Sequence, residues 1–134
     1  MTSNPTLIQV GNTTIQAYHG KSFDDWIKKN HQLDYTKPCN IMTQQLEKRH
    51  LAPIYGETTP NCPEKEDNLI INPVPDIIHT GHIHITQYKQ YKGIHLLNSG
   101  TYQDQTSFQK LHMLRPTTGL TPILKNGKIS LKQF

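Results

Sequence analysis

The sequence has few apolar residues and no long apolar run. Ile, Leu, Val and Phe contribute 31 of its 134 residues. Counting glycine but not tyrosine, about 35% of the chain is apolar, against about 45–50% in an average globular domain. No run approaches the roughly 20 apolar residues of a membrane span, and residues 1–5 carry no signal-peptide pattern. We therefore expect a cytoplasmic chain with no membrane partner and one modest core.

Cysteine and arginine are also scarce. Cys39 and Cys62 are the two cysteines and have no framework of further cysteines around them. This favours reduced thiols in a cytosolic protein, with a disulfide as the alternative. The formal net charge is +4, but the lysines are scattered and only two arginines are present. The charge suits nucleic-acid contact without establishing it.

Turn signals and apolar periodicity predict a layered α/β (α+β) domain. Gly11-Asn12 and Asn126-Gly127 are typical hairpin turns, and Ser22-x-x-Asp25 has the spacing of a helix capping box. We expect strands over 6–10, 13–18, 69–71, 76–79, 83–88, 93–98, 110–114, 121–125 and 128–132. Helices are expected from Ser22 onward and over 38–49, and a long irregular loop over 51–68.

The strongest chemical signal lies where one apolar strand ends. The segment from Asp76 to His79 continues through Thr-Gly to His82 and His84. We expect Gly81 to adopt a backbone conformation that other residues avoid. Residues two apart in an extended segment point to the same side. The two imidazoles are therefore suited to ligate one metal, or one each of two metals about 3.5–4 Å apart. Two histidines on a surface turn are the alternative.

A third histidine, His19, follows the second expected strand. The carboxyl end of a strand, where the chain turns into a helix, is where α/β proteins collect polar ligands. His79 lies three residues before His82 and is a candidate to orient a metal-binding ring from behind. Structural roles for His19 and His79 remain alternatives. The other histidines are expected on the surface: His31, His50, His95 and His112.

These segments resemble a known family. Tyr18-His19-Gly20 and Gly81-His82-Ile83-His84 look like the last two metal motifs of calcineurin-like metallophosphoesterases. More narrowly, three segments resemble the C-terminal part of the small subunit of archaeal family-D DNA polymerases, namely 49–56, 74–84 and 98–109. The resemblance runs over about residues 4–119 and is densest over 74–109.

The resemblance implies both a fold and an activity. Residues 1–134 would form the C-terminal part of one catalytic domain, half of a metallophosphoesterase β-sandwich flanked by helices. The activity implied is that of a proofreading 3′→5′ exonuclease in DNA replication, which hydrolyses phosphodiesters with two metal ions. His19 and His82 would ligate one metal and His84 the other. Mn²⁺ is the family's usual ion, and the ligand types also suit Fe or Zn.

The sequence departs from the family by lacking its earlier motifs. Asp-x-His, Gly-Asp-x-x-Asp and Gly-Asn-His-Asp are all absent. Three imidazoles without a carboxylate do not hold two divalent cations against their mutual repulsion. We therefore expect a fragment, a split gene product or a truncated pseudo-enzyme that is inactive alone and has an uncovered apolar face. The expected partners are the missing N-terminal half, the large polymerase subunit (in a heterodimer or larger assembly) and DNA.

Further cations are weaker candidates for DNA contact. They are Lys48, Arg49 and His50 at a helix end, and Lys89 and Lys92 beside two tyrosines. Two other functions remain open. One is a non-catalytic assembly subunit of a DNA polymerase. The other is a general metallophosphoesterase that acts on phosphomonoesters or phosphodiesters.

Overall fold

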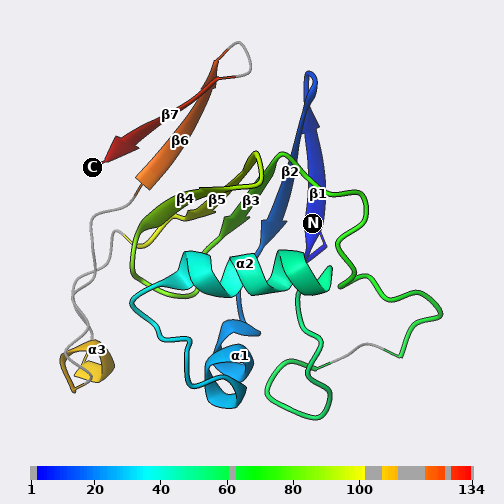
Figure 1. The fold of residues 1–134 in the computed structure, drawn as a ribbon, viewed down its shortest axis with the longest axis vertical. Helices are drawn as coiled ribbons and strands as arrows, with labels where there is room; N and C mark the ends of the chain where they lie inside the picture. Colours follow the sequence, from blue (N-terminus) through cyan, green and yellow to red (C-terminus); the bar gives the residue numbers. More distant parts are fainter. Residues whose placement is uncertain (1–2, 61–62, 102–106, 112–119, 126–127, 134) are drawn as a thin grey trace.

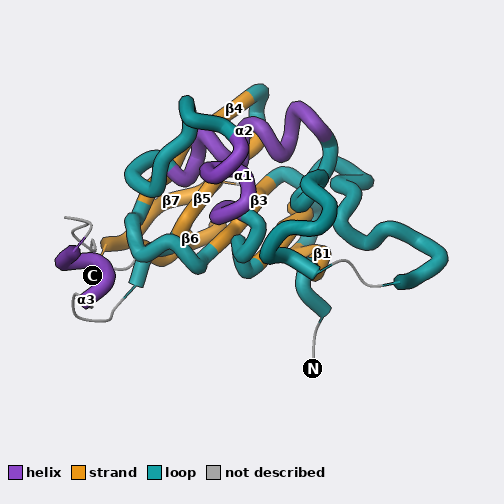
Figure 2. The backbone as a smooth tube through the Cα atoms, turned by 90° about the horizontal axis from the view of Figure 1, so that it is seen from below, coloured by secondary structure: helices purple, strands orange, loops and turns teal. Residues whose placement is uncertain are grey.

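A five-stranded mixed sheet with two helices on one face forms the body of the molecule. The computed structural model describes residues 3–60, 63–101, 107–111, 120–125 and 128–133. Figures 1 and 2 show α1 and α2 lying together on the same side of the sheet, which confirms the predicted α/β class. The elements are β1 Thr6–Val10, β2 Thr13–Tyr18, α1 Phe23–Lys29, α2 Pro38–Lys48, β3 Ile77–Thr80, β4 Gln87–Tyr91, β5 Ile94–Asn98, α3 Ser107–Leu111, β6 Leu120–Lys125 and β7 Lys128–Gln133.

The sheet order is β1-β2-β3-β5-β4, with β2, β3 and β5 parallel. β1 and β4 run antiparallel to their neighbours at the two edges. In register, Tyr18 pairs with Thr80, and Thr80 pairs with Asn98. The carboxyl ends of all three parallel strands therefore lie together, along the edge of the sheet that is formed by strand ends. The residues that follow them, beginning with His19 and Gly81, emerge side by side at that edge.

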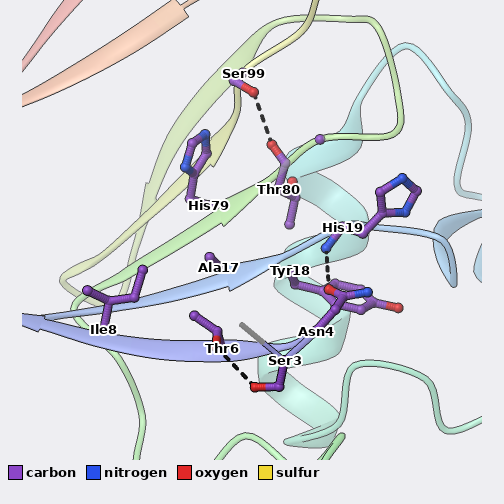
Figure 3. Close-up of a pocket in the computed structure, with 11 residues that line it drawn as sticks. Ser3, Asn4, Thr6, Ile8, Ala17, Tyr18, His19, His79, Thr80 and Ser99 are labelled. Atoms are coloured by element: carbon purple, nitrogen blue, oxygen red, sulfur yellow. Dashed lines mark hydrogen bonds between the residues drawn. The ribbon is translucent and has the colours of Figure 1, made fainter. Parts of the chain in front are cut away.

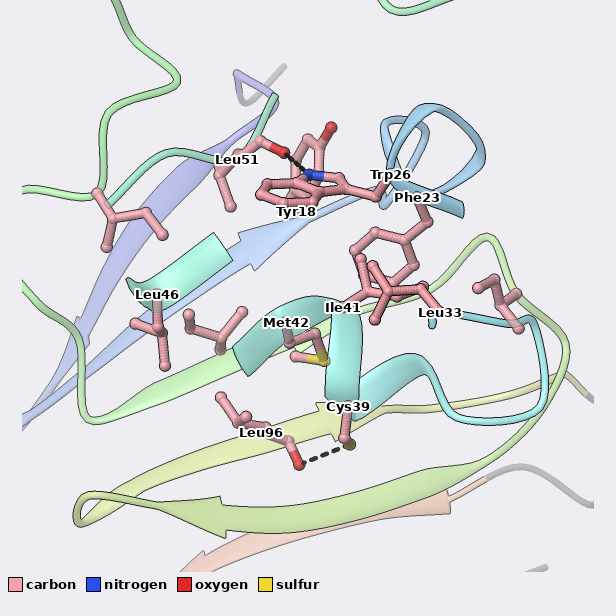
Figure 4. Close-up of a cluster of buried hydrophobic side chains, with 13 residues drawn as sticks. Tyr18, Phe23, Trp26, Leu33, Cys39, Ile41, Met42, Leu46, Leu51 and Leu96 are labelled. Carbon is pink, nitrogen blue, oxygen red and sulfur yellow. Dashed lines mark hydrogen bonds between the residues drawn. The ribbon is translucent and has the colours of Figure 1, made fainter. Parts of the chain in front are cut away.

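The core lies between the sheet and the helices (Figure 4). The helix expected over 38–49 is present as α2, and its apolar periodicity places Ile41, Met42 and Leu46 on one face, which is buried there. Cys39 is a buried free thiol whose Sγ donates to the Leu96 carbonyl at 3.6 Å, and burial raises its pKa to about 12. Cys62 lies outside the described residues. The helix periodicity therefore predicted the packed face correctly, and Cys39 is a core residue.

The helix predicted at Ser22 is present, but the predicted capping box is not. Ser22 has no side-chain cap hydrogen bond and instead donates from Oγ to the Leu51 carbonyl at 2.6 Å. The Asp25 carboxylate accepts hydrogen bonds from Thr58 and Thr59. Both side chains thus hold the irregular loop after α2 against α1. Tertiary partners replace the local pair that the spacing predicted.

Of the strands expected in the middle of the chain, one is wrong and one begins later than expected. Residues 69–71 form only an isolated bridge, between Ile70 and His50. The strand expected over 83–88 begins at Gln87 instead, because Asn98 holds the preceding segment in a different way. Its Nδ2 donates to the carbonyls of Ile83 and Ile85 at 2.6 and 2.7 Å. A buried amide therefore takes the place of strand pairing over this segment.

The C-terminal predictions had mixed outcomes. The hairpin of β6 and β7 is confirmed, with Lys125 paired to Lys128, while its Asn126-Gly127 turn lies outside the described residues. The strand expected over 110–114 is wrong where the structure describes it, since residues 107–111 form the short helix α3. Short apolar runs do not distinguish a helix turn from a strand by periodicity alone.

The face of the sheet turned away from the helices is apolar and partly uncovered. Ile77 and Leu97 on this face are buried, at 3% and 1% exposed. On the edge strand β1, Ile8 and Val10 share the face and are 43% and 49% exposed. The predicted uncovered apolar surface is thus present along β1. Among the described residues, no helix is long and apolar enough to cross a membrane.

Candidate metal-ligand site

Two short loops meet at the edge where the parallel strands end. His19 follows β2, and His82 follows β3 after Gly81. Their ring centroids lie 5.0 Å apart with the ring planes at 52°. The loops also touch through their backbones, because the Gly81 amide donates to the His19 carbonyl at 3.3 Å. The structure therefore brings together two of the three histidines that the sequence proposes as ligands.

Close backbone packing fixes these loops. Gly20 has φ +98°, and a Cβ there would lie 3.1 Å from the Gly81 carbonyl oxygen and 3.2 Å from the His82 Cβ. The positive φ expected at Gly81 is wrong, because the left-handed residue is His82, with φ +64°. Side chains rarely adopt this conformation, and such strain persists where the surroundings hold it. The direction of the His82 side chain is therefore set by a strained backbone.

A carboxylate that the sequence analysis did not propose completes this cluster. Asp24, in the first turn of α1, places Oδ2 3.0 Å from His82 Nε2. Lys21 donates to the same oxygen at 3.1 Å, and the Tyr35 hydroxyl donates to Oδ1 at 3.1 Å. Partial burial opposes ionisation, but the hydrogen bonds from Lys21 and His82 outweigh it and hold the pKa of Asp24 below its ordinary value. The carboxylate is therefore ionised at neutral pH.

The position of Asp24 carried a signal that was available from the sequence. It lies five residues after His19, at the start of the helix that follows β2. A helix start directly after a strand lies at the same edge as the strand's carboxyl end.

The His19 side chain is in the protonation state that metals need. Its pKa is lowered from the ordinary imidazole value, mainly by desolvation and also by the nearby His82 and Lys21. At neutral pH the ring is therefore neutral and retains a lone pair for a ligand.

The third proposed ligand, His84, lies two residues beyond His82 in the irregular segment before β4 and is half-buried. Within the residues that the structure describes, no three His, Cys, Asp or Glu side chains gather closely enough to hold a metal ion. His19 and His82 thus fit the donor chemistry of a metal centre, but only as a part of one. The remaining ligands would have to come from outside the described residues.

His79 lies near the same edge of the sheet, in the lining of a pocket. It lines a pocket of about 350 Å³ together with His19, Thr80 and Ser99 (Figure 3). Its Nε2 is buried and has no hydrogen-bond partner among the described residues, and burial lowers its pKa. The neighbour that contacts the His82 ring nitrogen is Asp24. An orienting role for His79 stays a prediction.

The remaining histidines lie where the sequence predicts or in local pairs. His31 is exposed. His95 Nδ1 lies 2.7 Å from the Tyr88 hydroxyl, and His50 Nε2 lies 2.8 Å from an Asp67 oxygen. His112 lies outside the described residues.

Two of the five cations proposed for DNA contact lie together, away from the histidines. Arg49 and Lys92 line a common cavity of about 290 Å³. Tyr91, which also lines it, pairs with Ile94 at the start of β5, so this cavity lies at the end of the sheet opposite His19. Arg49 Nε donates to the Ile71 carbonyl at 2.9 Å. Contact with DNA stays a prediction for all five cations, Lys48, Arg49, His50, Lys89 and Lys92.

Comparison with known proteins identifies the relatives of the chain. No protein-family model matches it. The DNA polymerase II small subunit of Methanothermobacter thermautotrophicus is 50% identical over 132 residues, covering 98% of this chain and 27% of that protein. The chain is homologous to part of DNA polymerase II small subunits. Those of Archaeoglobus fulgidus and Methanocaldococcus jannaschii are 44% and 40% identical over 124 and 129 residues. They cover 92% and 96% of this chain, and 25% and 22% of the relatives.

These relatives confirm the resemblance of segments 49–56, 74–84 and 98–109 to the small subunit of a DNA polymerase. The chain spans about a quarter of the length of the DNA polymerase II small subunits that it matches. Among solved structures, Vps29 of Entamoeba histolytica complexed with zinc matches with a TM-score of 0.45 at 18% identity, over 98% of this chain and 59% of that one. Vps29 of Cryptosporidium parvum matches with a TM-score of 0.41 at 18% identity, over 96% and 55%.

Proposed function

We propose that the chain is the C-terminal part of a 3′→5′ exonuclease domain in the small subunit of a DNA polymerase. The observation that carries the proposal is the meeting of His19 and His82 at the strand edge, 5.0 Å apart between ring centroids. It occurs in a chain that is 50% identical to a DNA polymerase II small subunit. The substrate is the phosphodiester at a DNA 3′ end, and the role is removal of terminal nucleotides during replication.

The proposed metal ligands are His19 and His82 for one ion and His84 for the second, with Mn²⁺ as the preferred ion and Fe or Zn as alternatives. A bound metal pair supplies positive charge against the negative charge that develops on the phosphate. The chain's own contribution is to place the imidazoles. The left-handed backbone of His82 fixes one ring, and the lowered pKa of His19 favours the neutral imidazole that a metal binds.

The site needs further ligands, so the proposal includes partners. We assign the missing carboxylates to the part of the longer relatives that precedes the matched segment, since the chain spans 27% of the first relative. The same part would cover the apolar face along β1, where Ile8 and Val10 are 43% and 49% exposed. The large polymerase subunit and DNA complete the assembly.

Reconstitution tests this function. The chain is co-expressed with the preceding part of the Methanothermobacter thermautotrophicus relative, and digestion of a 5′-labelled single strand is followed with Mn²⁺ and with EDTA. Activity is expected only in the reconstituted protein with metal, and His82→Ala should lower the rate by about 100-fold or more. His31→Ala, on an exposed side chain, is the control and should be neutral. Full activity in the His82→Ala/His84→Ala double variant would overturn the assignment.

One observation favours a second candidate, a non-catalytic assembly subunit. No three ligating side chains gather in the part of the chain that the structure describes. This candidate predicts that the reconstituted protein binds the large subunit but digests no DNA. A general metallophosphoesterase, in contrast, would hydrolyse a chromogenic phosphomonoester or phosphodiester in the same assay.

A further inference from the structure

The contact between Asp24 and His82 joins two segments that are 58 residues apart. Asp24 Oδ2 lies 3.0 Å from His82 Nε2, and the His19 and His82 rings lie 5.0 Å apart between centroids. The carboxylate, the strained His82 backbone and the second imidazole thus converge on one ring. This convergence raises the question of which ring nitrogen is left for a ligand.

We propose that Asp24 is a positioning residue that accepts a hydrogen bond from His82 Nε2–H and so directs His82 Nδ1 toward the metal. The inference rests on the proposed function for the identity of the ligand. A neutral imidazole carries its proton on one nitrogen and a lone pair on the other. The nitrogen bound to a carboxylate keeps the proton, because an ionised carboxylate is only an acceptor. Histidines that bind metals usually make such a bond with their second nitrogen.

Asp24 is built to act as a fixed acceptor. Its Oδ1 accepts from Tyr35, in the connection between α1 and α2, and its Oδ2 also accepts from Lys21, just before α1. Two segments therefore hold the carboxylate in place independently of its contact with His82. The backbone of His82 is held at φ +64°, so only rotation about its side-chain torsions can still turn the ring. The hydrogen bond to Asp24 fixes that rotation.

The first test uses the metal-free chain. Long-range ¹H–¹⁵N correlation spectra of the histidine-labelled chain at pH 8 should show His82 protonated at Nε2, with a hydrogen-bonded, slowly exchanging proton. Asp24→Ala should abolish that protected proton, whereas Asp24→Asn should keep it, because the amide oxygen still accepts. Asp34→Ala is the matched control, since Asp34 is an exposed carboxylate whose side chain binds the nearby Thr36. A spectrum unchanged by Asp24→Ala would overturn the hydrogen bond.

The second test measures Mn²⁺ affinity of the reconstituted protein by titration calorimetry. Asp24→Ala should weaken binding about 10–100-fold, the usual effect of removing a partner of a metal-binding histidine. Asp24→Asn should recover most of that loss. Equal losses in both variants would make Asp24 itself a ligand and overturn the positioning role. Unchanged affinity in Asp24→Ala would overturn it while leaving the exonuclease proposal standing. A wild-type protein that binds no Mn²⁺ would overturn both.

Discussion

The two ends of the parallel strands differ in how their polar side chains are used. At the carboxyl end, His19 and His82 face each other across strained, tightly packed loops, with an ionised carboxylate beside them. At the opposite end, Arg49 and Lys92 line a cavity together with Tyr91. Arg49 donates to the Ile71 carbonyl, and Lys92 lies over the Tyr91 ring at 5.3 Å.

The difference teaches where to look for chemistry in this chain. The cations at the second end make contacts within the chain, Arg49 with a backbone carbonyl and Lys92 with an aromatic ring. Left-handed backbone occurs at both ends, at His82 (φ +64°) and at Arg49 and Lys92 (φ +56° and +48°). What distinguishes the first end is that two imidazoles and a carboxylate contact one another there. Net positive charge alone favours the second end, whereas the proposed metal site lies at the first.

The largest expected effect compares the two ends in the reconstituted exonuclease. His82→Ala should lower the turnover rate by about 100-fold or more, because it removes a proposed metal ligand. Lys92→Ala should leave turnover unchanged and, through loss of one phosphate contact, weaken binding of single-stranded DNA only a few-fold. Steady-state kinetics with separate kcat and KM values check both. A loss of turnover in Lys92→Ala as large as that in His82→Ala would erase the distinction between the ends.

The next effect concerns stability. Asp25 is 2% exposed, and each of its carboxylate oxygens accepts two hydrogen bonds from Thr58 or Thr59. Asp25→Ala should reduce the free energy of unfolding by about 3 kcal/mol, because four hydrogen bonds to a buried, charged acceptor are lost.

The matched change is Asp67→Ala, which removes an exposed carboxylate 2.8 Å from His50. It should cost no more than about 1 kcal/mol. Urea denaturation of both variants measures the difference, and equal losses would show that the loop is not anchored through Asp25.

Substitutions at two glycines distinguish the cost of close packing from the cost of a left-handed backbone. Gly20 and Gly93 have φ +98° and +82°, but only Gly20 has atoms close to the position of a Cβ. Gly93→Ala should therefore lower the free energy of unfolding by about 1 kcal/mol, the cost of the left-handed conformation alone. Gly20→Ala should lower it by about 2–3 kcal/mol, because the added Cβ also meets neighbouring atoms. Thermal unfolding compares them. Equal losses of stability would mean that the loops around His19 and His82 shift to accommodate the added Cβ.

The smallest effect is on the pH dependence of stability. Desolvation opposes ionisation of Asp25, but the hydrogen bonds from Thr58 and Thr59 lower its pKa in the folded chain. The stabilisation by the ionised Asp25 carboxylate is complete above the unfolded pKa of about 3.9 and is lost as pH falls through the lower pKa of the folded chain. The stability of Asp25→Asn should therefore fall less between pH 5 and pH 2.5 than that of the wild type. Parallel curves would exclude Asp25 as a source of the dependence.

Local sequence signals predicted much of the framework. The Gly11-Asn12 turn and the periodicity of α2 gave the first hairpin and the helix face, because both depend on nearby residues. The meeting of His19 and His82 also followed from the sequence, since both were placed at strand ends. Parallel pairing of β2 and β3 then brings those ends to one edge.

What the sequence could not supply depends on distant partners. Ser22 prefers the Leu51 carbonyl to a local cap, and the contact between Asp24 and His82 spans 58 residues. The positive φ lies on His82 and not on Gly81, although glycine has the lower cost for it, because the packing of Gly20 against His82 decides the loop.

The most direct test of the central claim is the structure of the reconstituted protein with Mn²⁺, read at the manganese absorption edge. We predict an anomalous peak within bonding distance of one nitrogen each of His19 and His82, with a second peak beside His84. The His82 nitrogen should be Nδ1, with Nε2 still bound to Asp24. A fully folded protein without manganese at His19 and His82 would contradict the account.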